Sequence, residues 1–363
     1  MTETTFDDFG PSKVVQLYSA KEGVRAIVVI DNTALGPAIG GVRVSPTVTM
    51  QEVCRLARTM TLKNSIAGLA HGGAKAGIVA HPDNPNKERV FRVFARMMRE
   101  LTEYIPGPDM GCNETSMAWI HDETGRSVGL PEELGGLPLD KLGATGFGVA
   151  ECAEVAASFA DIKLSGARFV IEGFGSVGKA AARFLAAKGA VLVAASDSRG
   201  AVHDPSGINV DELIEVKQQT GSVMNYGKVA SMPSAEIFGV PCEILIPAAA
   251  PDVIHGGNAG IIRTRLILQG ANIPATVQAE AQLHSRGILV VPDFIANAGG
   301  VIMAAMEYAG KNEQEAFAAI TERIRKNTRL VLEKAASEQS LPRLAADTLA
   351  RERVTRAMSY RDF

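Results

Sequence analysis

Short apolar runs and amphipathic segments alternate along most of this chain, which is the pattern of an α/β protein. In the first part, strands are predicted over 24–31 and 76–81, and amphipathic helices over 49–60 and 86–101. The stretch 133–146 is rich in glycine and interrupts the pattern, so we place a domain boundary there. The sequence shows no repeat with the period of a solenoid or a propeller.

Beyond this boundary the alternation becomes more regular and predicts a parallel sheet. A strand, a glycine turn, a helix and a second strand follow one another over 167–198. Further apolar strands are predicted over 243–249, 266–272 and 288–293, and long helices begin at about residue 312.

Length and composition are those of a folded chain with two domains. The chain has 363 residues, more than one hydrophobic core usually serves, and 46% of them are hydrophobic. The formal net charge is −3 with both signs mixed along the chain, so no basic stripe indicates a nucleic-acid partner. We expect one domain over 1–142, completed by C-terminal helices within 325–363, and a second domain over 143–324.

The cysteines and the N-terminus favour a soluble protein of the reducing cytoplasm. The four cysteines form no C-x-x-C pair, which argues against a zinc site and against a disulfide framework. The first ten residues are acidic and polar, unlike a signal peptide, and no apolar run is long enough for a membrane helix. We therefore expect no metal and no membrane partner.

The stretch GFGSVG, residues 173–178, is the strongest local signal for a ligand. It is a G-x-G-x-x-G motif in its required context, with a buried strand before it, a helix after it, and a second strand ending at Asp197 about 20 residues later. The first glycine permits the tight turn, the second lets a diphosphate approach the backbone, and the third lets helix and strand pack closely. The predicted cofactor-binding residues of the motif are Gly173, Gly175, Ser176, Val177 and Gly178. An ordinary strand–helix turn is the alternative, and the complete unit argues against it.

The type of nicotinamide cofactor depends on the end of the second strand. Asp197 would accept hydrogen bonds from the adenosine ribose and repel a 2′-phosphate, which favours NAD. A solvated turn aspartate is the alternative, and Arg199 could instead hold a 2′-phosphate, so NADP stays open. Asn272 and Asn297 each follow a later strand and would supply amide hydrogen bonds near the nicotinamide, unless they are ordinary turn residues.

Two lysines and one aspartate of the first part are candidates for chemistry. Lys63 continues the apolar face of the helix over 49–60, either reaching water at the helix end or placing a charge in a cleft. Lys75 lies in the glycine-rich stretch AHGGAKAGI, and Ala76 after it rules out a P-loop motif. A desolvated lysine with a lowered pKa would serve as a base near neutral pH. Asp109 would be its counter-charge, or merely a turn residue.

Taken in order, these pieces resemble the glutamate/leucine/phenylalanine/valine dehydrogenase family over nearly the whole chain. The segments that carry the resemblance are LGPAIGGVR (35–43), MTLKNSIAGLAHGGAKAGI (60–78), GPDMG (107–111), GATGFGV (143–149), GFGSVG (173–178), QGANIPAT (269–276) and PDFIANAGGV (292–301). The resemblance implies reversible oxidative deamination of an L-amino acid to a 2-oxo acid and ammonia, with NAD or NADP. It further implies a homo-oligomer, a catalytic domain before a Rossmann domain, and a cleft that closes between them.

The resemblance also implies roles for individual residues. Lys75 would activate water and Asp109 would exchange protons with it, while Lys63 would hold the substrate α-carboxylate with the backbone of Gly40 and Gly41. The glycines around Lys75 would let the substrate approach the backbone. Additional contacts are implied for Thr145, with the nicotinamide amide, and for Asn272, with the substrate.

Two departures from the glutamate-specific pattern bear on the substrate. Members specific for glutamate carry a lysine where this chain has Ile39 and a serine where it has Ala304. Both replacements remove polar groups, and a side-chain carboxylate buried without a partner would cost several kcal/mol, roughly. The sequence thus favours leucine, valine, isoleucine or phenylalanine, with glutamate as the alternative because segments such as GPDMG are closer to the glutamate branch. Ser176 replaces an asparagine that is frequent in the family.

Two other classes of function compete with the enzyme. A NAD-binding regulator without catalysis would need none of Lys63, Lys75 and Asp109, so their joint presence argues against it. A nucleic-acid-binding protein is disfavoured by the net charge and by the lack of a basic patch.

Overall fold

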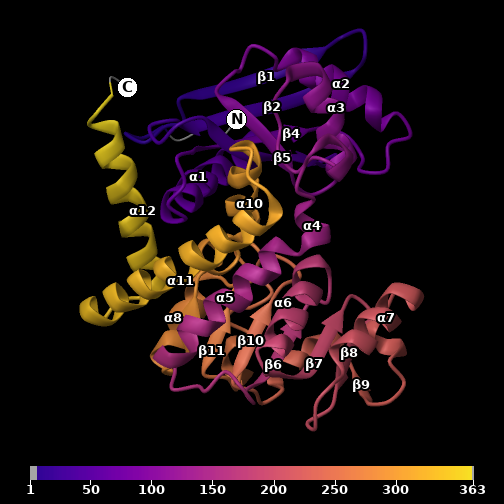
Figure 1. Ribbon diagram of the computed structural model, residues 1–363, viewed down its shortest axis with the longest axis vertical. Helices are drawn as coiled ribbons and strands as arrows, with labels where there is room; N and C mark the ends of the chain where they lie inside the picture. Colours follow the sequence, from indigo (N-terminus) through magenta and orange to yellow (C-terminus); the bar gives the residue numbers. More distant parts are fainter. Residues whose placement is uncertain (1–5, 362–363) are drawn as a thin grey trace. The chain divides into compact units, whose positions relative to one another are not determined.

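The computed structural model describes residues 6–361, which divide into two compact units. Figure 1 labels the helices and strands. The first unit contains the chain up to Leu142, Val301–Ala319 and the residues from Asp347 onward, and the second unit contains Gly143–Gly300 and Ile320–Ala346.

The first unit is built on a mixed sheet with the strand order β1-β2-β4-β3-β5. Strands β3, β4 and β5 are parallel, whereas β2 runs antiparallel to both β1 and β4. The strands are β1 (Lys13–Ser19), β2 (Val24–Asn32), β3 (Ala38–Val44), β4 (Gly72–Ile78) and β5 (Tyr104–Pro108). The helices are α1 (Met50–Ile66), α2 (Lys87–Met97), α3 (Glu114–Thr124), α4 (Leu139–Leu142) and most of α10 (Gly299–Tyr308).

Helices cover both faces of this sheet. Val29 of β2 packs in a cluster with Val53 and Ala57 of α1, whereas its neighbours Val28 and Ile30 pack in the cluster that contains the aromatic residues of α2. Successive residues of a strand point to opposite faces, so α1 lies on one face and α2 on the other. A strand covered on both sides reads as a continuous apolar run, which is why the sequence predicted β2 correctly.

The second unit is built on a sheet with the order β12-β11-β10-β6-β7-β8-β9. Its first five strands are parallel, and β8 and β9 add an antiparallel edge. The strands are β6 (Arg168–Glu172), β7 (Val191–Asp197), β8 (Gly200–His203), β9 (Ala230–Met232), β10 (Ile244–Pro247), β11 (Leu266–Leu268) and β12 (Leu289–Val291). The helices are α5 (Ala144–Phe159), α6 (Ser176–Ala187), α7 (Val210–Thr220), α8 (Val277–Ser285) and α9 (Asp293–Ala296). The fold is the predicted two-part α/β architecture.

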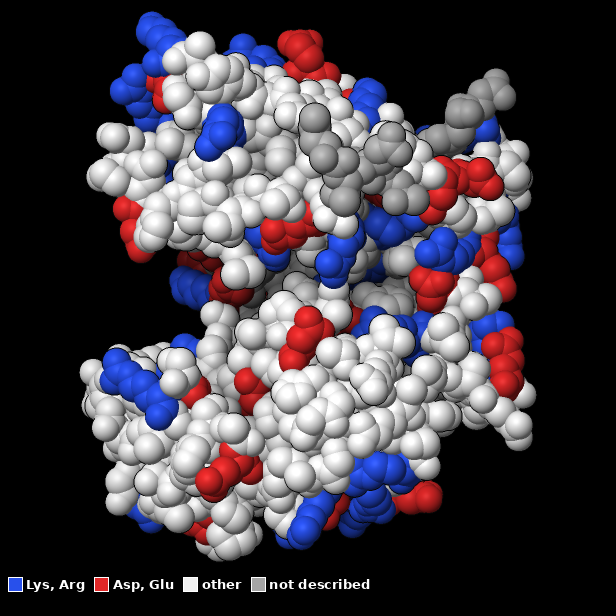
Figure 2. Space-filling model, turned by 180° about the vertical axis from the view of Figure 1, so that it is seen from behind, with Lys and Arg blue, Asp and Glu red and all other residues white. Residues whose placement is uncertain are grey.

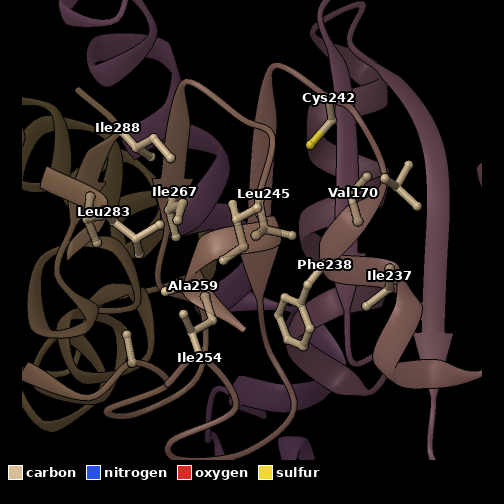
Figure 3. Close-up of a cluster of buried hydrophobic side chains, with 14 of the residues drawn as sticks. Val170, Ile237, Phe238, Cys242, Leu245, Ile254, Ala259, Ile267, Leu283 and Ile288 are labelled. Carbon is tan, nitrogen blue, oxygen red and sulfur yellow. The ribbon is translucent and has the colours of Figure 1, made fainter. Parts of the chain in front are cut away.

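The core of the second unit joins its central strands. Val170 of β6, Leu245 of β10 and Ile267 of β11 point into one buried cluster, where Leu283 of α8 packs against them (Figure 3). Within the sheet, β6 pairs with β7 along one edge and with β10, which comes later in the chain, along its other edge. Ligands of such sheets lie at the carboxyl ends of the strands where the order reverses, so β6 and β10 mark the expected ligand position.

The C-terminal helices divide differently from the predicted domain limits. We predicted 143–324 as one domain and 325–363 as the completion of the other, but Val301–Ala319 packs with the first unit and Ile320–Ala346 with the second. The chain therefore changes unit inside α11 (Glu313–Glu338) and again inside α12 (Pro342–Met358). An apolar stripe on a helix indicates that one face is buried, but it does not indicate which core buries that face. Hydrophobic periodicity alone therefore does not locate the residues at which the chain passes from one unit to the other.

Charged side chains on the face shown in Figure 2 mix both signs among uncharged neighbours. This agrees with the formal net charge of −3 for the whole chain. Within residues 6–361, no helix combines the length and apolarity needed to cross a membrane.

Candidate active site

Lys75 lies in the middle of β4, not at the start of a strand after a glycine turn as the sequence suggested. The strand is buried along its whole length, and the Lys75 side chain is only 7% exposed. Its Nζ lies 2.9 Å from Oδ2 of Asp109, the residue that follows β5. The structure therefore brings together the two residues predicted to be catalytic, as a buried ion pair.

A second cation, Arg43 of β3, shares the same carboxylate oxygen. Its Nε donates to Oδ2 of Asp109 at 3.0 Å, and its Nη1 donates to Oε1 of Glu52 at 2.7 Å. Burial alone would raise the pKa of Asp109, but the charges and hydrogen bonds of Lys75 and Arg43 lower it to about 2. Asp109 is therefore ionised throughout the physiological pH range.

The two other titratable groups near Asp109 stay neutral at physiological pH. Burial raises the pKa of the Cys112 thiol to about 12, and its Sγ accepts a hydrogen bond from the Asp109 N–H at 3.2 Å. Burial also raises the pKa of Tyr104, whose hydroxyl donates to the carbonyl of Gly40 at 3.0 Å. The charge of this cluster is consequently set by Asp109, its two cations and the Glu52 carboxylate that binds Arg43.

The double glycine of β3 adjoins this pair. A Cβ on Gly41 would lie 3.1 Å from Nζ of Lys75 and 2.7 Å from Cβ of Asp109. A Cβ on Gly40 would lie 1.6 Å from the carbonyl oxygen of Ala74 in β4. Gly40 thus permits close pairing of the strands, and Gly41 leaves space beside the ion pair.

The glycines before Lys75 serve the packing of the protein itself, so the expectation that they admit the substrate is wrong for Gly72 and Gly73. A Cβ on Gly72 would lie 1.9 Å from the carbonyl oxygen of Asn32, and one on Gly73 would lie 2.0 Å from the backbone nitrogen of Thr61. The physical reason is that Gly72 lies against the end of β2 and Gly73 packs directly under α1, so neither position has room for a side chain.

Lys63 is buried in the last turn of α1 and does not extend into solvent. Thr49 caps the start of this helix, because its side chain accepts from the N–H of Glu52. The Glu52 carboxylate binds Arg43 of β3. Next to Lys63, Asn64 donates from Nδ2 to the carbonyls of Ile39 and Gly72, which ties α1 to the strands that carry Gly40 and Lys75.

The two residues that replace polar groups of the glutamate-specific pattern are both buried. Ile39 of β3 is 3% exposed, and Ala304 of α10 is 4% exposed. The α10 helix is attached to the first unit through Glu307, whose carboxylate accepts from the N–H groups of Gly129 and Leu130 at 2.9 and 3.0 Å.

In the second unit, the GFGSVG stretch forms the turn between β6 and α6. Gly173 has φ +93, a Cβ on Gly178 would lie 2.1 Å from the carbonyl oxygen of Gly173, and a Cβ on Gly175 would meet nothing within 4 Å. The three glycines therefore provide a turn, a close helix–strand contact and open space above the backbone. Ser176 and Val177 begin α6, whose first N–H groups lack intrahelical acceptors. This cradle fits a diphosphate.

Of the remaining predicted residues of the second unit, Thr145 lies at a helix start and Asn297 directly follows α9. Thr145 is in the first turn of α5, and a Cβ on Gly300 would lie 2.9 Å from its Oγ1. Asn297 is 3% exposed and donates from Nδ2 to the carbonyls of Gly270 and Ala271 and to Oδ1 of Asn272. These amide hydrogens thus hold the loop that carries Asn272, whatever further role the residue has.

Sequence reasoning missed Arg43 and Lys217. Arg43 follows Gly41 by two positions on β3, so both lie on the face that meets Asp109, and this alternation was the available signal. Lys217 of α7 places Nζ 2.6 Å from Oδ2 of Asp197. No sequence signal linked these two, because they are separated by β8 and a loop.

Comparison with known proteins identifies the class to which this fold and these residues belong. Residues 135–362 match the family described as Glutamate/Leucine/Phenylalanine/Valine dehydrogenase, and residues 11–126 match the Glu/Leu/Phe/Val dehydrogenase dimerisation domain. The chain belongs to the glutamate/leucine/phenylalanine/valine dehydrogenase family, and it is an amino acid dehydrogenase, an oxidoreductase that uses NAD(P).

Individual relatives in this family are named for glutamate. The chain is 40% identical to a glutamate dehydrogenase of Aeropyrum pernix, over 91% of this chain and 85% of the relative. It is 38% identical to the NADP-specific glutamate dehydrogenase of Saccharolobus shibatae, with 91% and 83% covered. It is 35% identical to the NAD-specific glutamate dehydrogenase of Staphylococcus aureus, with 91% and 84% covered.

A solved structure agrees with the fold of the whole chain. It is the leucine-bound hetero-hexameric glutamate dehydrogenase of Thermus thermophilus, with a TM-score of 0.88 and 30% identity. The similarity covers 97% of this chain and 90% of that one.

Proposed function

We propose that this protein catalyses the reversible oxidative deamination of an L-amino acid, with Lys75 as the base and Asp109 as its proton-transfer partner. The observation that carries the proposal is the buried pair itself, with 2.9 Å between Nζ and Oδ2 and side chains only 7% and 13% exposed. Burying two charges costs free energy, and a structural role alone is met as well by apolar packing. Clustered, buried ionisable groups are typical of sites where protons move.

The residues of the first unit account for the proton transfers. Lys63 binds the substrate α-carboxylate, with the N–H groups of Gly40 and Gly41 beside it. Bound NAD(P) supplies the acceptor for the hydride on Cα, which leaves an iminium carbon on the substrate. Water adds to that carbon while Nζ of Lys75 accepts one of its protons. Asp109 relays this proton from Nζ to the amino nitrogen, and the C–N bond breaks so that ammonia leaves. The hydroxyl oxygen becomes the carbonyl of the 2-oxo acid as its proton passes to Nζ of Lys75.

The residues of the second unit hold the cofactor. The N–H groups at the start of α6 and the open space at Gly175 would receive the diphosphate, and Thr145, in the first turn of α5, would contact the nicotinamide amide. Relatives specific for NAD and for NADP both occur among the similar proteins, so either cofactor agrees with the family.

Glutamate is the substrate that the relatives indicate. The relatives described above are glutamate dehydrogenases and are covered over most of their length. This supports the alternative of the sequence analysis better than its main prediction of a hydrophobic amino acid.

A hydrophobic amino acid remains the second candidate because of one specific observation. Ile39 and Ala304 are apolar and buried where glutamate-specific members are expected to carry a lysine and a serine. A side-chain carboxylate beside them would need another cation or would lose several kcal/mol, roughly.

Replacing the proposed base tests the reaction. We expect Lys75→Ala to lower kcat by about a thousandfold or more, since proton-transfer groups contribute roughly 10²–10⁴-fold and Asp109 also loses one of its two cations. Binding of the nucleotide by the second unit should be unchanged. NADH or NADPH formation is followed by absorbance, with nucleotide binding as the control for folding. A variant that deaminates every accepted amino acid at the wild-type rate would refute the mechanism.

Comparing substrates tests specificity. Wild type is assayed with glutamate, leucine and phenylalanine at one pH, with both cofactors, and so is Ile39→Lys. If glutamate is the substrate, wild type prefers it without the added lysine. If a hydrophobic amino acid is the substrate, wild type prefers leucine or phenylalanine, and the added lysine shifts kcat/KM toward glutamate.

We also propose that the chain forms homo-oligomers. The support is its match to a dimerisation domain over residues 11–126 and its similarity to a protein described as a hetero-hexamer. The cytoplasmic location stays a prediction.

A further inference from the structure

The carboxylate at the end of β7 is fully engaged by the protein. Oδ2 of Asp197 accepts from Nζ of Lys217 at 2.6 Å and from the Val223 N–H at 2.8 Å. Oδ1 accepts from the Arg199 N–H at 2.9 Å and from Oγ of Ser222 at 3.2 Å. A carboxylate offers about four acceptor positions. All of them are used here before any ligand binds.

This engagement removes the two properties by which an acidic residue at this position selects NAD. In a dinucleotide fold the carboxylate accepts the ribose hydroxyls, and its negative charge repels a 2′-phosphate. Here the Asp197 side chain is only 7% exposed, and an ammonium group 2.6 Å away compensates its charge. The hydrogen bonds lower the pKa of Asp197 although burial raises it, so the compensated ion pair persists at neutral pH.

Two residues that donate hydrogen bonds to this carboxylate, Lys217 and Arg199, have cationic side chains. Lys217 retains 21% side-chain exposure, and Arg199 lies exposed on the turn that follows β7. Glu212 of α7 is bound by Lys228, so it does not compete with Asp197 for Lys217. Two cations against one carboxylate favour an anion at the end of β7, and ammonium and guanidinium groups bind phosphate well.

We propose that Lys217 sets the cofactor specificity of this dehydrogenase by neutralising Asp197, so that the site accepts a 2′-phosphorylated nucleotide as readily as its unphosphorylated counterpart. Arg199 supplies a second contact to the phosphate. The inference rests on the nucleotide-binding half of the proposed function. It goes beyond that half because it assigns dual use of NAD and NADP to one ion pair.

The test measures binding without turnover. ADP-ribose and 2′-phospho-ADP-ribose are titrated by calorimetry into the full chain, with no amino acid present, at two salt concentrations. The variants are Lys217→Met, which keeps the aliphatic stem and removes the charge, and Asp197→Asn. The matched control is Lys228→Met, which removes a lysine of the same region whose ion pair is with Glu212.

In wild type we expect dissociation constants for the two probes within tenfold of each other. Lys217→Met should weaken the phosphorylated probe by roughly ten- to a hundredfold, the range of one charge-assisted hydrogen bond, and ADP-ribose by less than threefold. Asp197→Asn should leave ADP-ribose binding within threefold, because that carboxylate does not hold the ribose. Lys228→Met should change neither probe.

Three results would overturn the inference. They are a wild-type preference for ADP-ribose of more than tenfold, an equal weakening of both probes in Lys217→Met, and a loss of more than tenfold in ADP-ribose binding in Asp197→Asn. In each case the nucleotide site stands and only the role of Lys217 is wrong. If neither probe binds wild type, the nucleotide site is wrong as well, and the proposed function fails with it.

Discussion

Replacing Arg43 should shift the acid limb of the activity profile, because Arg43 is one of the two cations that keep Asp109 ionised. Its Nε lies 3.0 Å from Oδ2 of Asp109, and its own side chain is 15% exposed. The pKa of Asp109 is lowered from 3.8 to about 2 against the effect of burial. Arg43→Gln removes one of the opposing charges and leaves the desolvation in place.

The size of the shift follows from the geometry. Two unit charges about 4 Å apart interact by roughly 4 kcal/mol at an effective dielectric constant of about 20, which corresponds to about 3 pKa units as an upper bound. Water that enters the space left by the guanidinium screens part of this loss. We expect the pKa of Asp109 to rise by about 1–2 units.

The sign of the stability effect is fixed by the same shift. A carboxyl whose pKa is lower in the folded state stabilises the fold above its unfolded pKa, and that stability disappears as the pH falls through the folded pKa. For Asp109 the window runs from 3.8 down to about 2. The contribution at neutral pH is about 2 kcal/mol. In Arg43→Gln, acid unfolding should therefore begin at a higher pH than in wild type.

The assay is the pH dependence of kcat/KM for the preferred amino acid, together with urea unfolding at pH 4 and pH 7. Glu52→Gln is the matched control, since it removes the outer partner of Arg43 and leaves both cations on Asp109. It should move the acid limb by less than half a unit, roughly, as expected for an exposed pair. An Arg43→Gln variant with an unchanged acid limb and unchanged stability at pH 4 would show that Arg43 does not control Asp109.

Two further predictions concern stability. Arg343→Met removes the guanidinium from Glu280 and Asp293, whose side chains are 4% and 2% exposed, and the uncompensated buried carboxylates should cost about 3–5 kcal/mol in urea unfolding at pH 7; a loss below about 1 kcal/mol would contradict this. Gly40→Ala places a Cβ 1.6 Å from a backbone carbonyl oxygen of β4 and should prevent folding of the first unit or lower the melting temperature sharply, as read by circular dichroism. Gly239→Ala, where nothing lies within 4 Å, is the control and should melt like wild type.

Local sequence patterns were sufficient to predict the structure where one continuous segment contains all the interacting groups. The GFGSVG turn is such a case, because strand, turn and helix start are consecutive and the constraints on each glycine act on neighbouring backbone. The buried strands were also readable, since a strand covered on both faces is apolar along its length. The order of the elements then restricted the fold to a two-part α/β architecture.

Local sequence patterns did not predict contacts between segments that are distant in the chain. The sequence named Lys75 and Asp109 but not Arg43, which reaches the same oxygen from a third strand. It identified Asn297 as a ligand candidate, whereas the structure uses its amide hydrogens to hold a loop. Periodicity also did not show that α11 passes from one unit to the other.

The sequence by itself determined the class of fold and the nucleotide turn, because these depend on residue type and short spacing, and it named Lys75 and Asp109 as candidates for the chemistry. Only the tertiary structure decided which charges share a carboxylate. It placed two cations on Asp109 and one lysine on Asp197. The physical reason is that Coulomb and hydrogen-bond energies depend on distances of a few ångströms, roughly, between groups that the chain brings together only when the sheets form.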